Sequence, residues 1–230
     1  KNKGFERYFK EARALLGYGV VVRREGPYRV ALLEKEKEAP PLPSLWRAFS
    51  ARILGAEYTF HHLPGVFSAG KVDPASLLLL EALQERLGPE GVRGRQVLDL
   101  GAGYGALTLP LARMGAEVVG VEDDLASVLS LQKGLEANAL KAQALHSDVD
   151  EALTEEARFD IIVTNPPFHV GGAVILDVAQ AFVDVAAARL RPGGVFFLVS
   201  NPFLKYEPLL EEKFGAFQTL KVAEYKVLFA

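Results

Sequence analysis

The sequence contains no cysteine, and no apolar run in its 230 residues reaches about 18 residues. The absence of cysteine excludes disulfides and thiolate metal sites, and it favours the cytosol over an oxidising compartment. The absence of a long apolar run excludes a transmembrane helix, and the first residues are not typical of a signal peptide. We therefore expect a cytoplasmic protein with no membrane partner.

Histidine is scarce, with four residues in the chain. His61 and His62 are adjacent and would face opposite ways on a strand, while His146 and His169 stand apart. None of them has the spacing of a metal-ligand set, so no metal site is predicted.

A strong net charge is also lacking, because 26 Lys and Arg nearly balance 29 Asp and Glu. The net charge of −3 argues against a generic nucleic-acid-binding surface. The charge is uneven, since residues 1–60 carry a net +5 and the remainder −8. A basic N-terminal part is able to contact phosphates, although a solvated face explains the same excess.

The first 43 residues differ in character from the rest. A helical apolar period over 5–16 is followed by two short β-like runs, and a helix with a hairpin is too small to bury a core. The stretch 34–43 is charged and then proline-rich, which is typical of a linker. We predict that residues 1–43 are the remnant of a preceding domain with its linker, and that residues 44–230 form the main domain. Because the chain opens with Lys1 rather than Met, we expect a fragment or a processed product.

Helices and strands alternate along the main domain. A short helix is expected at 46–54 and a strand at 57–63. The next helix has Asp73 as its N-cap, Pro74 in its first turn and Gly88 at its end. Further strands are expected at 97–100, 117–121, 142–146, 159–164 and 195–200, separated by helices at 106–114, 125–138, 174–190 and 206–214, and a hairpin of strands 217–222 and 225–229 closes the chain. The alternation predicts an α/β fold, a Rossmann-like doubly wound and mostly parallel seven-stranded sheet with a C-terminal antiparallel hairpin.

A glycine-rich loop joins the first parallel strand to its helix. The sequence Gly101-Ala102-Gly103-Tyr104-Gly105 lets the backbone turn tightly and approach a ligand closely. Glu122 ends the next strand 19 residues beyond Gly103, where a carboxylate can bind ribose hydroxyls. Asp99 precedes the first glycine, and its charge suits a cationic group such as the ammonium of an amino acid. A carboxylate that braces the loop is the alternative.

Asp148 and Val149 follow the third strand of this sheet. The Asp148 carboxylate is suited to accept the amino group of an adenine, while Val149 offers a backbone N–H to the ring. A helix cap at Asp148 is the alternative.

The apolar run 159–164 ends in Asn165-Pro166-Pro167-Phe168. Neither proline can donate to a strand ladder, and each restricts the residue before it, so the strand ends in a stiff corner. This corner holds the Asn165 side chain and two backbone carbonyls, which suits a flat group with N–H donors such as an exocyclic amine. Phe168 offers a face on which a planar base can stack. A strand-to-helix turn without a ligand is the alternative.

Together these motifs resemble a class I S-adenosylmethionine-dependent methyltransferase. The stretch 97–103 resembles the first motif of that family, Glu122 its ribose acid, Asp148 its adenine contact, and Asn165-Pro166-Pro167-Phe168 its amino-methylation motif. Further stretches resemble the RsmC-type enzymes, which methylate the guanine N2 amine of small-subunit ribosomal RNA: Leu63-Pro64-Gly65-Val66-Phe67-Ser68, Asp73, Leu77-Leu78-Leu79, His169, Ala179-Gln180 and Asn201-Pro202-Phe203-Leu204-Lys205-Tyr206. Pro202 is a departure from that pattern.

The resemblance covers residues 57–230 and implies S-adenosyl-L-methionine as cofactor, S-adenosyl-L-homocysteine as product, and 16S rRNA or the assembled small ribosomal subunit as partner. It implies that the Asn165 side-chain oxygen and the Pro166 carbonyl each accept one N–H of the amine. Phe168 would hold the extruded base. The implied cofactor contacts are Phe67, Lys71, Asp99, Gly101, Ala102, Gly103, Glu122, Asp123, Asp148, Val149 and Asn165. The implied substrate contacts are Pro167, Phe168, Lys205 and Tyr206.

For Phe67 the alternative is a core position, and for Lys71 a surface position. Three other functions fit part of the pattern. An adenine-N6 or protein-glutamine amide methyltransferase uses the same chemistry, although Tyr at position 168 is more usual there. A non-catalytic RNA-binding paralogue is disfavoured by the intact Asp99, Glu122 and Asn165. A nicotinamide oxidoreductase fits the glycine loop but does not need the proline corner.

Overall fold

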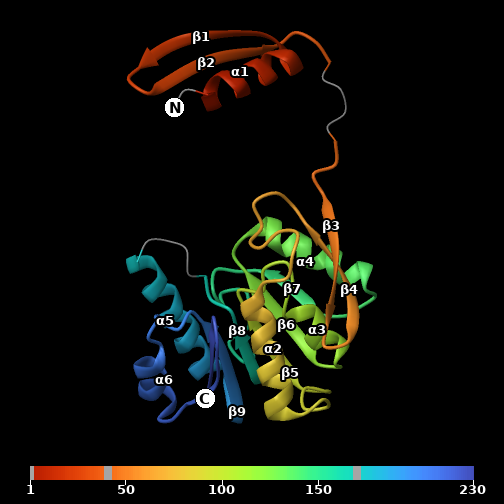
Figure 1. Ribbon diagram of the computed structural model, residues 1–230, viewed down its shortest axis with the longest axis vertical. Helices are drawn as coiled ribbons and strands as arrows, with labels where there is room; N and C mark the ends of the chain where they lie inside the picture. Colours follow the sequence, from red (N-terminus) through yellow and green to blue (C-terminus); the bar gives the residue numbers. More distant parts are fainter. Residues whose placement is uncertain (1–2, 39–42, 168–171) are drawn as a thin grey trace. The chain divides into compact units, whose positions relative to one another are not determined.

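The computed structural model describes residues 3–38, 43–167 and 172–230 (Figure 1). The chain divides into two compact units, residues 1–45 and residues 46–230. The first unit comprises α1 (Lys3–Leu16), β1 (Gly17–Glu25) and β2 (Tyr28–Lys35).

In the first unit, α1 packs against one face of the antiparallel β1–β2 pair. A Cβ atom at Gly19 would lie 2.5 Å from Cγ of Arg13, so the glycine permits this close approach. The opposite face exposes apolar side chains, among them Val20 and its cross-strand partner Leu32, which are 37% and 55% exposed. None of the described residues of this unit belongs to a buried hydrophobic core. Because β2 continues to Lys35, part of the stretch predicted as linker is strand.

The second unit is built on a seven-stranded sheet of order β10-β11-β9-β8-β5-β6-β7. Strands β5 to β9 are parallel, whereas β11 runs antiparallel to β9 and β10 antiparallel to β11. This confirms the predicted mostly parallel sheet with a C-terminal hairpin. The strands are β5 (Gln96–Leu100), β6 (Glu117–Glu122), β7 (Gln143–His146), β8 (Phe159–Thr164), β9 (Leu190–Ser200), β10 (Gln218–Val222) and β11 (Lys226–Phe229).

Helices cover both faces of this sheet, as a doubly wound fold requires (Figure 1). Val97 and Ile161 face a core shared with α2, α3 and α4, while their neighbours Leu98 and Ile162 face a core shared with α5 and α6. Because successive strand residues point to opposite faces, the central strands are apolar on both sides. The helices are α2 (Pro74–Leu87), α3 (Thr108–Arg113), α4 (Leu125–Ala137), α5 (Gly172–Arg189) and α6 (Glu207–Phe214).

The predicted ends of α2 are confirmed. The Asp73 carboxylate accepts the backbone N–H of Ser76 at 3.1 Å, which satisfies one of the free donors of the first turn. Pro74 is the first helical residue, and Gly88 caps the end with a φ of 80°. These caps fix where Asp73 and Ser76 stand relative to the sheet edge.

The helix predicted at residues 46–54 is wrong, because this segment forms strand β3 (Arg47–Ile53) paired with β4 (Ala56–His62). Side chains on β3 alternate between exposed and covered positions, which is a strand period. The turn between the strands uses Leu54 and Gly55 at φ 48° and 83°, the backbone of a two-residue hairpin. Pairing with β4 therefore overrode the weak helical pattern.

This hairpin packs against the glycine loop that follows β5. The ring of Phe49 stacks on that of Phe60 with centroids 5.2 Å apart, and Phe60 meets Tyr104 edge to face at 5.5 Å. Tyr104 lies within the glycine loop, and its hydroxyl donates to the Lys71 carbonyl at 3.0 Å. The aromatic cluster thus supports the loop from behind.

Candidate functional site

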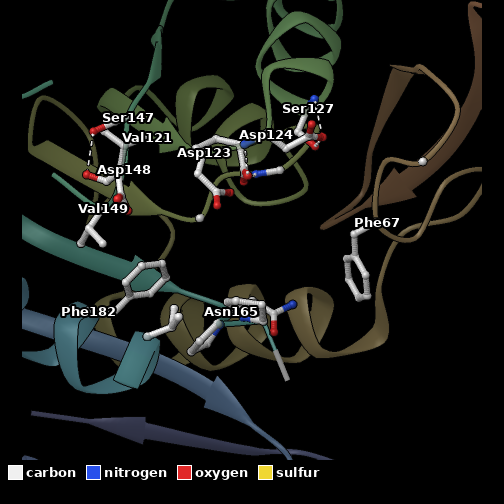
Figure 2. Close-up of a pocket in the computed structure, with 17 residues that line it drawn as sticks. Phe67, Val121, Asp123, Asp124, Ser127, Ser147, Asp148, Val149, Asn165 and Phe182 are labelled. Atoms are coloured by element: carbon white, nitrogen blue, oxygen red, sulfur yellow. Dashed lines mark hydrogen bonds between the residues drawn. The ribbon is translucent and has the colours of Figure 1, made fainter. Parts of the chain in front are cut away.

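A cavity of about 520 Å³ lies at the carboxyl ends of the parallel strands. From β5 the chain continues outward through β6 and β7 and then crosses back to β8 on the other side of β5, so the strand order reverses at β5. Ligands of open α/β sheets bind at such a switch point. The cavity is lined by Gly65, Phe67, Gly101, Gly103, Val121, Glu122, Asp123, Asp124, Ser127, Ser147, Asp148, Val149, Asn165, Pro166, Pro167, Val178 and Phe182. In Figure 2, Val149 and Phe67 lie at opposite ends, with Asp123 along one side and Asn165 along the other.

The glycine loop brings backbone to the floor of the cavity. The N–H groups of Gly101 and Ala102 both donate to the Val121 carbonyl at 3.0 Å, which ties the loop to β6. Gly101 has a φ of 72°, and a Cβ atom there would lie 3.2 Å from the Phe182 ring. The positive φ therefore favours glycine at this position, and a larger residue would also press on the Phe182 ring.

Glu122 is held by two backbone donors. Its Oε2 accepts the Gly103 N–H at 2.7 Å, and its Oε1 accepts the Asp124 N–H at 3.1 Å. Burial, followed by the neighbouring Asp123, raises the pKa of Glu122 to about 7. The carboxylates of Asp123, Asp124 and Asp148 line the same cavity, so it favours a ligand with hydroxyl donors or positive charge.

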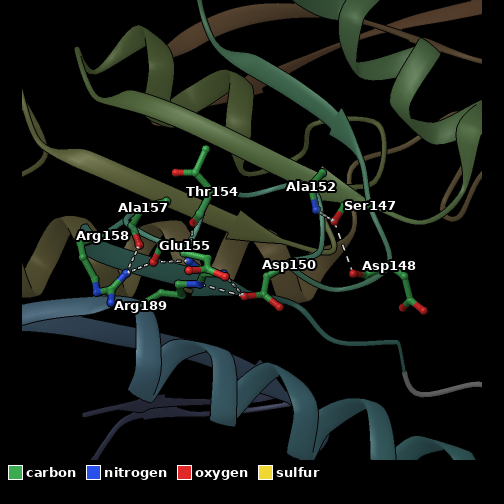
Figure 3. Close-up of polar contacts among 9 residues, drawn as sticks. All are labelled: Ser147, Asp148, Asp150, Ala152, Thr154, Glu155, Ala157, Arg158 and Arg189. Carbon is green, nitrogen blue, oxygen red and sulfur yellow. Dashed lines mark hydrogen bonds and ion pairs between the residues drawn. The ribbon is translucent and has the colours of Figure 1, made fainter.

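The segment that carries Asp148 and Val149 is braced by an arginine from α5 (Figure 3). The Arg189 side chain donates to the Asp150 carboxylate at 2.8 Å and to the Thr154 carbonyl at 2.6 Å. Val149 has a φ of 46°, which is strained for a β-branched residue. The brace stabilises a loop conformation that its own residues disfavour.

Asp99 is fully buried beneath the glycine loop. Its Oδ2 accepts the Thr108 hydroxyl at 2.6 Å, while Oδ1 has no hydrogen-bond partner among the described residues. Burial raises the pKa of Asp99 to about 7. Asp99 lines a small cavity of about 50 Å³ that shares Gly101 and Asn165 with the large one. Asp99 therefore holds the Thr108 hydroxyl, in line with the alternative that this carboxylate braces the loop. Its other oxygen stays available to a cationic group.

Asn165 stands at the end of β8 with its amide locked. Its Nδ2 donates to the Asp73 carboxylate at 2.8 Å and to the Ser76 hydroxyl at 3.0 Å. Its Oδ1 is buried and has no partner among the described residues. An unpaired buried carbonyl oxygen at a cavity wall is a ready acceptor for a ligand N–H.

Most of the predicted site residues converge on these two cavities. The large cavity is lined by Phe67, Gly101, Gly103, Glu122, Asp123, Asp148, Val149, Asn165, Pro166 and Pro167, and the small one adds Asp99 and Ala102. Phe67 is 49% exposed and is therefore not a core residue. Phe168 lies outside the described residues.

Three predicted contacts do not line either cavity. Lys71 and Lys205 have exposed side chains, so the surface alternative fits Lys71. The substrate contact predicted for Tyr206 is wrong, because its side chain is 2% exposed and packs in the core with Leu210. The residue precedes α6, and its ring anchors that helix to the sheet.

Several lining residues escaped prediction. Asp124 and Ser127 carried a signal, because a carboxylate three residues before a serine is typical of an N-cap, and Asp124 caps α4 in this way. Phe182 and Val178 have no such signal in the sequence, since only the packing of α5 on the sheet brings them to the cavity.

Within residues 3–38, 43–167 and 172–230, no group of three or more His, Asp and Glu side chains is arranged to hold a metal ion. Over the same described residues, no helix combines the length and apolar character needed to cross a membrane.

Comparison with solved structures supports the fold. A methyltransferase from Pyrococcus furiosus matches with a TM-score of 0.58 at 18% identity, over 75% of this chain and 87% of that one. An S-adenosylmethionine-dependent methyltransferase from Agrobacterium tumefaciens also gives a TM-score of 0.58 at 18% identity, over 82% and 71% of the two chains. At this identity the likeness concerns the fold alone.

Comparison with curated proteins gives relatives of higher identity. The ribosomal RNA small subunit methyltransferase C of Chromohalobacter salexigens is 39% identical over 175 residues, which cover 76% of this chain and 50% of that protein. The protein of the same name from Pseudomonas aeruginosa strain LESB58 is 34% identical over 96% of this chain and 65% of its own length. The chain thus spans between half and two thirds of these two relatives. A model of the methyltransferase small domain matches residues 57–229, and the chain therefore belongs to the methyltransferase small domain family.

Proposed function

We propose that this protein transfers a methyl group from S-adenosyl-L-methionine to the exocyclic N2 amine of a guanine in 16S rRNA. The observation that carries the proposal is the buried Oδ1 of Asn165, which has no hydrogen-bond partner in the part of the chain that the structure describes and is held at the cavity wall by Asp73 and Ser76. The name of the relatives, ribosomal RNA small subunit methyltransferase C, supports ribosomal RNA as the substrate class.

The residues at the cavity fit the proposed cofactor. In this proposal Glu122 accepts ribose hydroxyls and Asp148 and Val149 contact the adenine. The Asp99 oxygen that has no partner among the described residues accepts the ammonium. When bound, S-adenosylmethionine supplies an electrophilic methyl group on a sulfonium. The carboxylates around the cavity complement the positive charge of that group.

Asn165 and Pro166 would orient the amine that accepts the methyl group. The lone pair of a guanine N2 is delocalised into the ring, which makes it a poor nucleophile. If Asn165 Oδ1 and the Pro166 carbonyl each accept one N–H, the nitrogen is drawn toward a tetrahedral geometry with its lone pair free. No strong base is required, because the nitrogen becomes acidic once it is alkylated. Positioning therefore supplies most of the acceleration.

The substrate is 16S rRNA, free or in the assembled small subunit, and the site of action is the cytoplasm. Residues 1–43 remain proposed as the remnant of a preceding domain. The exposed apolar face of β1–β2, which includes Val20 and Leu32, supports this assignment, because an apolar face of this kind marks a surface that packs against another protein surface. Stacking of the base on Phe168 also remains a proposal.

The test is transfer of radiolabelled methyl to unmethylated small subunits and to naked 16S rRNA, with the label mapped by nuclease digestion. Label on a guanine N2 supports the proposal. Label on an adenine N6 or on a glutamine side chain would replace it with one of the alternative acceptors, and no transfer by a chain that still binds the cofactor would support the non-catalytic alternative.

Asn165→Ala provides the matched test of mechanism. The variant should bind the cofactor nearly as well as the parent protein, while turnover falls by roughly 10²-fold or more, as for other losses of a positioned polar group. Isothermal titration and single-turnover kinetics separate the two effects. Equal turnover would remove Asn165 from the mechanism.

A further inference from the structure

A tight turn directly follows β9 and presents an aromatic ring to solvent. The Leu204 N–H donates to the Asn201 carbonyl at 3.1 Å, which closes a four-residue turn with Pro202 and Phe203 at its centre. Phe203 is 76% exposed, the largest exposed fraction of any large apolar side chain in the described part of the chain. Lys205, on the far side of the turn, is also exposed.

The turn is anchored at both ends, so the exposure of Phe203 does not come from a loose loop. Ser200 and Tyr206, which flank it, are each 2% exposed. Lys226 of β11 pairs with Ser200 across the sheet, is itself 4% exposed, and forms an ion pair with Glu207. Pro202 restricts the backbone further, because its ring fixes φ. The proline that departs from the expected pattern thus stiffens the turn that carries Phe203.

Strand register brings this turn beside the Asn165 corner. Strands β8 and β9 are parallel neighbours, with Thr164 opposite Leu198. Asn165 follows Thr164 and leaves the carboxyl edge of the sheet one strand away from the chain that continues into the turn. Neighbouring strands lie about 4.8 Å apart. The Asn165 corner and the turn that carries Phe203 therefore leave the same edge of the sheet from neighbouring strands.

We propose that Phe203 is a stacking platform for the RNA base next to the target guanine, with Lys205 near the adjoining phosphate. This inference rests on the proposed function and describes how the same site takes its RNA. Extruding a guanine deprives its neighbour of a stacking partner, and a rigid aromatic face can replace that partner. An exposed ring beside a lysine, on a pre-formed turn, matches a single-stranded nucleic acid in both stacking and charge.

The test compares Phe203→Ala and Phe203→Trp with the parent chain, and Leu129→Ala serves as control because Leu129 is 40% exposed on α4. With naked 16S rRNA, Phe203→Ala should raise the KM for RNA about 5- to 160-fold, the range of a lost base–aromatic stack. The KM for the cofactor and the melting temperature should stay unchanged. Phe203→Trp should restore the KM for RNA, and Leu129→Ala should leave it at the parental value.

Binding of a short fluorescein-labelled single-stranded RNA supplies a second readout that does not depend on turnover. The Kd should rise for Phe203→Ala and recover for Phe203→Trp. Unchanged Kd and KM in Phe203→Ala would overturn the inference, as would a loss confined to assembled subunits, which would indicate a protein contact. A parent chain that binds RNA through Phe203 but methylates none would retain this inference and refute the proposed function.

Discussion

The Asn165 amide nitrogen lies 2.8 Å from a carboxylate oxygen of Asp73, a residue 92 positions earlier in the chain. The same Asp73 oxygen caps α2 by accepting the Ser76 N–H. One carboxylate thus joins the start of a helix to the end of the central strand. Because Asn165 Nδ2 is engaged on that side, Oδ1 is left as the acceptor at the cavity wall.

The substitution Asp73→Ser separates the two functions of this carboxylate, which are capping α2 and holding the Asn165 amide. Serine is a good N-cap, so the helix start should be retained, but its side chain is too short to reach Asn165. We expect stability close to that of the parent chain and a kcat lowered roughly tenfold or more, because the Asn165 amide loses its charged acceptor and is held by the Ser76 hydroxyl alone. Thermal unfolding and single-turnover methyl transfer check the two parts. A parental kcat with intact folding would contradict the positioning role.

The raised pKa of Asp99 predicts that the free energy of unfolding depends on pH. Its pKa is about 7 in the folded chain, against an ordinary value of 3.8. Between these values the unfolded chain has lost the proton while the folded chain keeps it, so the free energy of unfolding falls as pH rises from about 4 to 7. Asp99→Asn should reduce the difference between pH 5 and pH 7.5 by about 1 to 3 kcal/mol. Urea titrations at pH 5 and pH 7.5 measure the free energy of unfolding at each pH. If the difference between them is the same in Asp99→Asn as in the parent chain, Asp99 is not the source of this pH dependence.

Glu122 predicts a selective loss of cofactor affinity. In Glu122→Gln, one of the two oxygens that accept the Gly103 and Asp124 N–H groups becomes an amide donor. We expect the Kd for S-adenosylmethionine to rise about tenfold, in keeping with the loss of one charge-assisted hydrogen bond. Isothermal titration calorimetry checks this. Glu117→Gln is the control, because Glu117 is exposed at the opposite end of the same strand. Similar losses in both variants would argue against a specific role.

The contacts of Arg189 predict an indirect effect on the affinity for S-adenosylmethionine. Removing its contacts to Asp150 and Thr154 in Arg189→Ala should loosen the segment that carries Asp148 and Val149. The Kd for the cofactor should rise severalfold, and limited proteolysis should cut the segment faster. Arg158→Ala is the matched control, since over the described residues the Arg158 side chain donates to the Glu155 and Ala157 carbonyls, both within three residues of itself. Unaltered proteolysis in Arg189→Ala would show that the brace is dispensable.

Local patterns in the sequence determined the outline of this protein. The caps of α2, the glycine loop after β5 and the proline corner after β8 were all predictable, because each depends on residues within a few positions of one another. The alternation of strands and helices then limited the fold to a doubly wound sheet, and the carboxyl ends of its strands had to gather Asp99, Glu122 and Asn165 at one edge.

Tertiary structure decided what depends on residues far apart in the chain. Residues 47–53 form a strand because they pair with β4, and Tyr206 is buried because α6 packs on the sheet. Phe182 reaches the cavity only through the packing of α5. The orientation of the Asn165 amide follows from Asp73, a contact with no local signature. Burial and long-range hydrogen bonds are properties of the assembled fold, and for that reason no local pattern could specify them.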